Sequence, residues 1–210
     1  MQENFLDFVD VPKESINLLE GNQSLDKMEA YVREYEEKLT KNGGIDLFIL
    51  GVHRNGYIGF QEPGSSKSGK SRLISLDPAS RVEAASDFFG EEHVPRKAVA
   101  MGVTHLMNAR EIIGIAVSEG KAKIIKKLVE ETSKPELVLS LLQQHENITL
   151  LIDTAAASEL TRFKCPWLVK NSLIHIQYTP TLIRKAVIWL ALTVNKAILK
   201  LTDDGKYNDR

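Results

Sequence analysis

Apolar residues in this 210-residue chain fall into short runs separated by polar turns. Three runs rich in branched side chains span residues 45–52, 111–117 and 147–153. Their length and nearly continuous hydrophobicity predict strands that are buried on both faces of a sheet. Two shorter runs, at residues 72–76 and 98–101, also predict strands.

Helical spacing of apolar side chains marks several segments between these strands. Residues 24–41 show an amphipathic pattern that ends at Asn42-Gly43-Gly44. The sequence Ser80-Arg81-Val82-Glu83 has the form of a capping box and predicts a helix that reaches Phe89. Because helices alternate with apolar strands, the predicted fold class is α/β, a Rossmann-like parallel sheet flanked by helices. Further helices are expected from Lys121 to Thr132, over residues 135–145 and over residues 181–196.

Charge and composition limit the kinds of partner. The chain has 27 basic and 28 acidic side chains, and this balance argues against a nucleic-acid-binding protein. The longest apolar run, residues 186–194, is too short to span a bilayer, and the N-terminus has no apolar leader, so no membrane association is expected. The single cysteine, Cys165, excludes an internal disulfide and indicates a reducing, cytoplasmic location.

Two predicted strand ends carry polar groups that could bind a ligand, because ligands of open α/β sheets bind at the carboxyl ends of the strands. The first, residues 51–63, contains turn-forming glycines and several polar side chains. The second is Ser118-Glu119-Gly120-Lys121, where a lysine at the start of a helix is well placed for a phosphate. From the pattern alone, a solvated Lys121 is the simpler interpretation. The histidines show no metal-ligand spacing, so no metal is expected.

The first of these strand ends begins an ordered set of motifs that continues along the chain. Six of its positions match a family signature: Gly51, Gly56, Ile58, Phe60, Glu62 and Pro63. Matches continue downstream at Gly64-Ser65-Ser66, Arg72, Arg81-Val82, Met101-Gly102-Val103, Gly120-Lys121-Ala122 and Ser158-Glu159-Leu160. Together they resemble the glucosamine-6-phosphate deaminase/isomerase family. The resemblance is strongest to a longer bacterial branch, in which a deaminase-like module is joined to a deacetylase-like module.

The resemblance implies a sugar phosphate ligand and no cofactor. Family members convert an amino-sugar 6-phosphate into a ketose 6-phosphate and ammonia, and a histidine held by an aspartate and a glutamate opens the sugar ring. In this chain the histidine position is Tyr57 and the aspartate position is Asn55, so only Glu62 of this group is retained. A tyrosine with a pKa of about 10 is a poor proton shuttle at neutral pH, so we expect degraded catalysis. His53, which replaces a family glycine in a turn, could be a relocated acid–base group, but drift at a site no longer in use is the favoured interpretation.

The resemblance also implies phosphate contacts. Lys121 matches the lysine that binds the substrate phosphate, but the family glycine three residues earlier is Ser118. The helical arginine of typical members falls at or beside Asp87. Ser65 and Arg72 match positions that bind an allosteric phosphate in some members. A surface arginine in a basic loop is an equally good interpretation of Arg72.

The alignment with the family places the start of this chain inside the family domain. We expect residues 1–163 to form a partial deaminase/isomerase-like domain without the first strands, and residues 164–210 to form a C-terminal helical extension. Such a sheet would expose a strand edge and a helix-free face, so homo-oligomerisation or self-association is expected. Two functions stay open: a divergent deaminase completed by another chain, or a non-catalytic sugar-phosphate-binding remnant.

Overall fold

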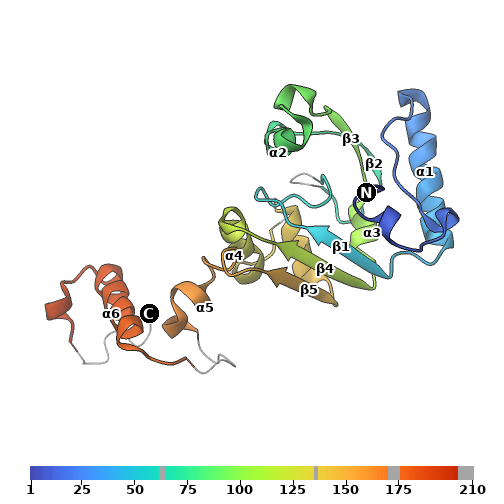
Figure 1. The fold of residues 1–210 in the computed structure, drawn as a ribbon. Helices are drawn as coiled ribbons and strands as arrows, with labels where there is room; N and C mark the ends of the chain where they lie inside the picture. The colour runs from blue at the N-terminus through green and yellow to red at the C-terminus, as the bar shows by residue number, and fades with distance from the viewer. Residues whose placement is uncertain (62–64, 135–136, 170–175, 203–210) are drawn as a thin grey trace.

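The computed structural model describes residues 1–61, 65–134, 137–169 and 176–202. Its centre is a parallel sheet, shown in Figure 1, that confirms the predicted α/β class. The three strands of this sheet, in spatial order, are β1 (Leu47–Gly51), β4 (Glu111–Ala116) and β5 (Ile148–Ile152). Each strand lies inside one of the three long apolar runs and is shorter than it.

One face of this sheet is packed against helical segments. Leu50, Ile112 and Ala116 point to this covered face, and each is at most 4% exposed. They form one core with the buried side chains of three segments: α3 (Val103–Met107), α4 (Ala122–Glu130) and the 3-10 segment η6 (Val138–Gln144). The core therefore lies on one side of the sheet, and its apolar burial is the main stabilising term there.

The opposite face, which we call the open face, carries the side chains of Leu47, Ile49, Ile115 and Leu151. These residues are 46%, 64%, 39% and 52% exposed. The prediction that the strands are buried on both faces is therefore wrong for the described residues, none of which buries this face. The apolar pattern indicates that these positions suit a buried environment. It does not indicate whether another segment packs against them.

A second, two-stranded sheet consists of β2 (Arg72–Ser75) and β3 (Lys97–Ala100). The two strands pair antiparallel and form a sheet separate from the parallel one, which the alternation of helices and strands did not predict. Between them, the chain makes a short helical excursion and reverses at Phe89 and Gly90, whose φ angles are 59° and 140°. This returns β3 alongside β2 without a crossover, and the ribbon ends with a bond from the Leu76 amide to the Arg96 carbonyl (2.9 Å).

The long helix α1 (Leu25–Lys41) agrees with the periodicity and packs on this ribbon through Met28 and Val32. Glu36 fastens the helix in place, because its carboxylate accepts bonds from the Ser71 amide (2.5 Å) and pairs with His105 Nε2 (2.9 Å). Burial alone would raise the pKa of Glu36, but the hydrogen bonds from Ser71 and His105 outweigh it and hold the pKa below its ordinary value.

Two helix predictions need correction, and one further helix was missed. Helix α2 (Pro78–Ala84) begins two residues before the expected capping box, because the Asp77 carboxylate accepts bonds from the amides of Ala79 (2.6 Å) and Ser80 (3.1 Å). The predicted helix at 135–145 is the 3-10 segment η6 over its described part, and residues 135–136 lie outside the described ranges. Helix α3 was not predicted, since it is a short element of five residues.

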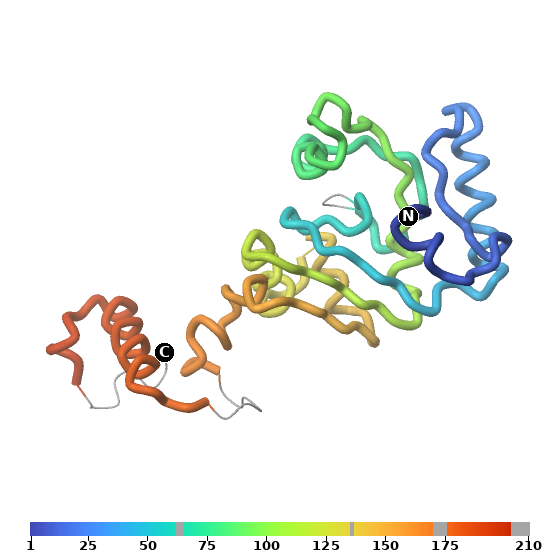
Figure 2. The backbone as a smooth tube through the Cα atoms, viewed as in Figure 1, coloured from blue at the N-terminus to red at the C-terminus, as the bar shows by residue number. Residues whose placement is uncertain are grey.

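The remaining described elements are short, apart from α6. They are η1 (Leu6–Phe8), η2 (Lys13–Ser15), η3 (Ala85–Phe88), η4 (Glu91–His93), η5 (Glu119–Lys121), α5 (Thr161–Lys164), η7 (Pro166–Leu168), α6 (Pro180–Thr193) and η8 (Ile198–Lys200). Figure 2 shows that the chain containing α5 and α6 leaves the sheet at one end, and Trp167 lies 6.2 Å from Trp189 between ring centroids. None of the described helices is long and apolar enough to cross a membrane.

Candidate functional site

The candidate site lies at the carboxyl edge of the parallel sheet. The segments following β1 and β4 contact Glu83 of helix α2 there, and the segment following β5 bonds to the turn after β4. The loop after β1 turns sharply, and Gly56, Gly59 and Phe60 have φ angles of 79°, 51° and 65°. At Gly56 a Cβ atom would lie 2.2 Å from Leu137 Cδ1, so glycine is required there by both the backbone conformation and the close approach of the core.

Tyr57 and Asn55, which the resemblance aligns with the ring-opening residues, are engaged in local contacts. Asn55 Oδ1 accepts a bond from the Tyr57 amide (3.3 Å), and the Tyr57 hydroxyl bonds to the carboxylate of Asp77. Burial of Asp77 favours its neutral form, but hydrogen bonds from Ser80, Ala79 and Tyr57 outweigh this and hold its pKa below the ordinary value. The structure thus ties Tyr57 to the N-terminal cap of α2, and Glu62 lies outside the described residues.

Gln61, which precedes Glu62, is anchored in the protein interior. Its side chain is 2% exposed, and Nε2 donates a bond to the Met101 carbonyl (2.8 Å). Within the described residues its Oε1 atom has no hydrogen-bond partner. The bond to Met101 connects the signature loop to the end of β3, so the loop is supported from both sheets.

Lys121 belongs to a charged cluster centred on Glu83 of α2. Lys121 Nζ donates a 2.8 Å bond to Glu83 Oε1, and His53 Nδ1 lies 3.3 Å from Glu83 Oε2. Arg54 Nε lies 3.8 Å from the same carboxylate. Although burial raises the pKa of Glu83, the Lys121 and His53 contacts outweigh it and hold the pKa below its ordinary value. The sequence interpretation missed this role, because it assigned Glu83 to a capping box.

The turn between β4 and Lys121 has an unusual backbone. Ser118 has φ 81° and ψ 154°, a region populated almost entirely by glycine. Its amide donates to both oxygens of Asp153 (3.2 and 3.0 Å), which follows β5. Asp153 Oδ1 also accepts from the Ala156 amide (2.7 Å), and bonds from Ala156 and Ser118 lower its pKa. The turn is therefore held by a carboxylate from the neighbouring strand.

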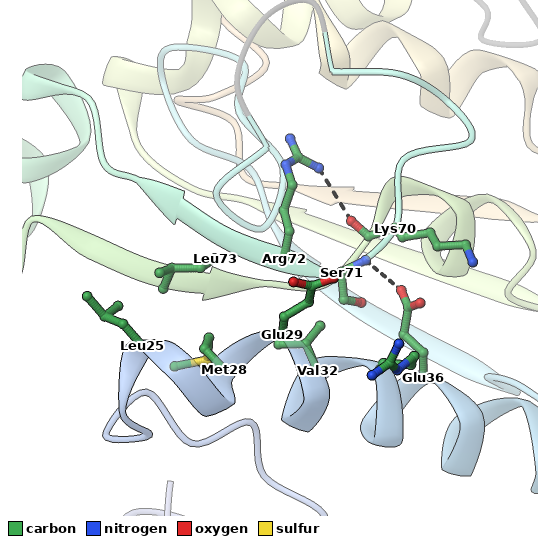
Figure 3. Close-up of a pocket in the computed structure, with 10 residues that line it drawn as sticks. Leu25, Met28, Glu29, Val32, Glu36, Lys70, Ser71, Arg72 and Leu73 are labelled. Atoms are coloured by element: carbon green, nitrogen blue, oxygen red, sulfur yellow. Dashed lines mark hydrogen bonds between the residues drawn. The ribbon is translucent and has the colours of Figure 1, made fainter.

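Ser65 and Arg72, the candidate allosteric pair, lie side by side. Arg72 Nη2 donates a long bond to Ser65 Oγ (3.4 Å), and Nη1 donates to the Lys70 carbonyl (3.4 Å). A cavity of about 390 Å³ lies between α1 and β2. Figure 3 shows the residues that line it, and Met28 and Val32 belong to its apolar wall. In that view the Arg72 guanidinium extends away from α1, so it does not face the apolar wall.

The other described histidines have structural contacts. His145 Nε2 donates to the Ala109 carbonyl (2.8 Å), and its Nδ1 accepts from the Asn147 amide (3.1 Å). His105 pairs with Glu36, and His93 is exposed near Glu92. His175 lies outside the described residues. Over the ranges that the structure describes, no group of three or more His, Cys, Asp or Glu side chains could hold a metal ion.

Relatives of known name cover different parts of this chain. A glucosamine-6-phosphate deaminase-like protein of Bacteroides thetaiotaomicron is 39% identical over 209 residues, which make up 100% of this chain and 31% of that protein. The glucosamine-6-phosphate deaminase of Clostridium acetobutylicum is 38% identical over 161 residues, or 76% of this chain and 66% of that protein. The chain thus spans about a third of the first relative and just under two thirds of the second. No protein-family model matches it.

Solved structures give a consistent picture of the fold. A structure described as a monomeric glucosamine-6-phosphate deaminase is 34% identical, has a TM-score of 0.63, and matches 66% of this chain and 57% of that chain. The 6-phosphogluconolactonase of Trypanosoma cruzi has a TM-score of 0.51 at 16% identity, over 68% of this chain and 56% of that chain. The second likeness concerns the fold alone.

Proposed function

Because the chain belongs to the glucosamine-6-phosphate deaminase family, we propose that it binds a sugar 6-phosphate of amino-sugar metabolism and opens the sugar ring poorly or not at all. The observation that carries this proposal is the juxtaposition of two segments at one sheet edge. The signature-like loop follows β1, and Lys121 follows β4, which is the adjacent parallel strand. Sites of this kind suit a small phosphorylated ligand.

The impaired chemistry follows from the side chains at the ring-opening positions. A general acid–base group must reach the sugar and titrate near neutral pH. The Tyr57 hydroxyl is bonded to Asp77, and Asn55 Oδ1 accepts a bond from the Tyr57 amide. Loss of one such group typically lowers the rate by about 10²–10⁴-fold. We therefore expect binding without useful turnover.

Calorimetric titration with glucosamine 6-phosphate tests the binding claim. We expect measurable binding by the unmodified chain and at least a tenfold loss in Lys121→Ala. The exposed Lys123 of α4 supplies a matched control, and Lys123→Ala should bind as the unmodified chain does. Equal affinities for Lys121→Ala and the unmodified chain would remove Lys121 from the site. An ammonia-release assay on the same samples should give no signal above background.

A divergent deaminase is the second candidate, and one contact favours it. His53 Nδ1 lies 3.3 Å from Glu83 Oε2, and a carboxylate at one ring nitrogen orients a histidine for acid–base work at the other. If this pair has replaced the family's ring-opening group, the chain should release ammonia from glucosamine 6-phosphate, and His53→Asn should abolish the release. Ammonia release that survives His53→Asn and is lost in Glu62→Gln would instead assign catalysis to the retained signature carboxylate.

Three further parts of the proposal follow from the family resemblance and the sequence. Residues 1–163 would act as a partial deaminase/isomerase-like domain, with residues 164–210 as an extension. Ser65 and Arg72 would offer a second phosphate contact, supported by their 3.4 Å approach. A cytoplasmic setting and self-association of the chain would accompany this role.

A further inference from the structure

Three side chains that can carry positive charge converge on the single carboxylate of Glu83. Lys121 and His53 contact different oxygens of this carboxylate, and Arg54 approaches from the loop after β1. The side chains of Lys121 and Glu83 are only 18% and 21% exposed, so their 2.8 Å contact is partly shielded from water. The arrangement resembles an anion-binding site in which the Glu83 carboxylate takes the place of a bound anion.

We propose that Glu83 is an internal occupant of the phosphate site, and that a sugar phosphate binds by displacing the Glu83 carboxylate from Lys121. This inference rests on the proposed function, since it takes Lys121 as the phosphate contact. A phosphate oxygen and the Glu83 carboxylate compete for the same ammonium group. Phosphate therefore binds only those molecules in which Lys121 is not paired with Glu83. The apparent affinity for phosphate falls in proportion to that fraction.

The turn before Lys121 supports the same conclusion independently. A phosphate at such a turn would use backbone N–H groups together with the ammonium group. The Ser118 amide, however, donates to both carboxylate oxygens of Asp153. Both kinds of phosphate donor at the end of β4 are thus bonded to internal carboxylates, one from α2 and one from the segment after β5.

Charge predicts the consequence of removing the internal occupant. The three side chains Arg54, Lys121 and Glu83 together have a net charge of +1, and Glu83→Gln raises it to +2. The variant frees the Lys121 ammonium and leaves an uncharged amide that can still bond to His53. If the ion pair is closed in about nine-tenths of the molecules, its removal should tighten phosphate binding about tenfold.

The experiment compares the unmodified chain with Glu83→Gln and Glu83→Ala in titrations with glucosamine 6-phosphate and with inorganic phosphate. Glu92→Gln is the matched control, because Glu92 is an exposed carboxylate of η4 that lies 3.9 Å from His93 Nδ1. Circular dichroism confirms the fold of each variant. The double variant Glu83→Gln/Lys121→Ala shows whether any gain depends on Lys121.

We expect both Glu83 variants to bind at least tenfold tighter than the unmodified chain, and the gain to disappear in the double variant. Tighter binding by the variants beside an unmodified chain that does not bind would support this inference and overturn the proposed function. Equal binding by all forms would leave the proposed function standing and overturn the inference. Weaker binding by the variants, or no binding by any form, would also overturn it.

A measurement on the unmodified chain covers the case in which the variants do not fold. Phosphate that displaces Glu83 should return the titration of its carboxyl, followed by NMR, toward that of an unpaired glutamate. A Glu83 titration that saturating phosphate leaves unchanged, or that no attainable phosphate concentration moves, would overturn the inference.

Discussion

The two faces of the parallel sheet are built from the same strands and the same kinds of residue, yet their surroundings differ. On the covered face, Ile112 and Leu50 are buried among helices, whereas Ile49 and Ile115 on the open face remain exposed to solvent. The composition of a strand therefore shows whether its side chains suit burial. Whether they are buried depends on another segment that covers that face of the sheet. The comparison also bears on the site, since the loop after β1 rests on the covered face through Gly56.

The largest expected difference between the faces concerns stability. Ile112→Ala should lower the free energy of unfolding by about 2–5 kcal/mol, because it removes buried methyl groups and leaves a cavity in the core. Ile115→Ala on the open face of the same strand should cost less than about 1 kcal/mol. Urea denaturation of both variants measures the difference. Similar losses in both would mean that the open face is packed in solution.

The sequence predicted the strands better than their environment. The apolar runs located β1, β4 and β5, and periodicity located α1, because each of these signals lies within a continuous segment. Whether a helix covers a face depends on residues distant in the chain, and no local pattern reports it. The antiparallel pairing of β2 and β3 was missed for the same reason.

The site was predictable to a similar extent. The sequence singled out the two strand ends separately, and the parallel pairing of β1 with β4 places both at the same edge of the sheet. The bond between Lys121 and Glu83 joins residues 38 positions apart. In the sequence, Glu83 fits a capping box equally well, so its charge partner could be identified only in three dimensions. Tyr57 is similar, because its bond to Asp77 depends on where α2 begins.

Two glycines extend the comparison between the faces. Gly56→Ala should destabilise the chain by about 1–3 kcal/mol, since its φ of 79° disfavours a side chain and the new Cβ would meet Leu137 at 2.2 Å. Gly51 lies in β1 with no atom within 4 Å of a built Cβ, so Gly51→Ala should change stability by less than about 0.5 kcal/mol. Thermal unfolding of the pair measures both. A larger loss for Gly51→Ala would show that something covers that part of the strand.

Self-association is the next expected effect, and it concerns the open face alone. Contiguous exposed apolar side chains favour contact with a second molecule. Sedimentation velocity should show concentration-dependent association of the unmodified chain, and Leu151→Lys should weaken it at least tenfold, or about 1.4 kcal/mol. Lys134→Ala, in the segment that follows α4, serves as an exposed control. A monodisperse monomer at all concentrations would contradict this prediction. It would mean that the open face is exposed without causing self-association.

The smallest expected effect lies at Ser118, where β4 leaves the sheet and the two faces end. Its φ of 81° and ψ of 154° cost about 1–3 kcal/mol for a residue with a side chain, whereas glycine adopts them freely. Glycine also has more freedom in the unfolded chain, which offsets about 0.4–1 kcal/mol of the gain. Ser118→Gly should therefore stabilise the chain by about 1 kcal/mol, measured by urea denaturation, while Ser158→Gly, at a residue without a positive φ, should not. The bonds to Asp153 use the backbone amide and persist in the variant, so a loss of stability would mean that the Ser118 side chain supports the turn.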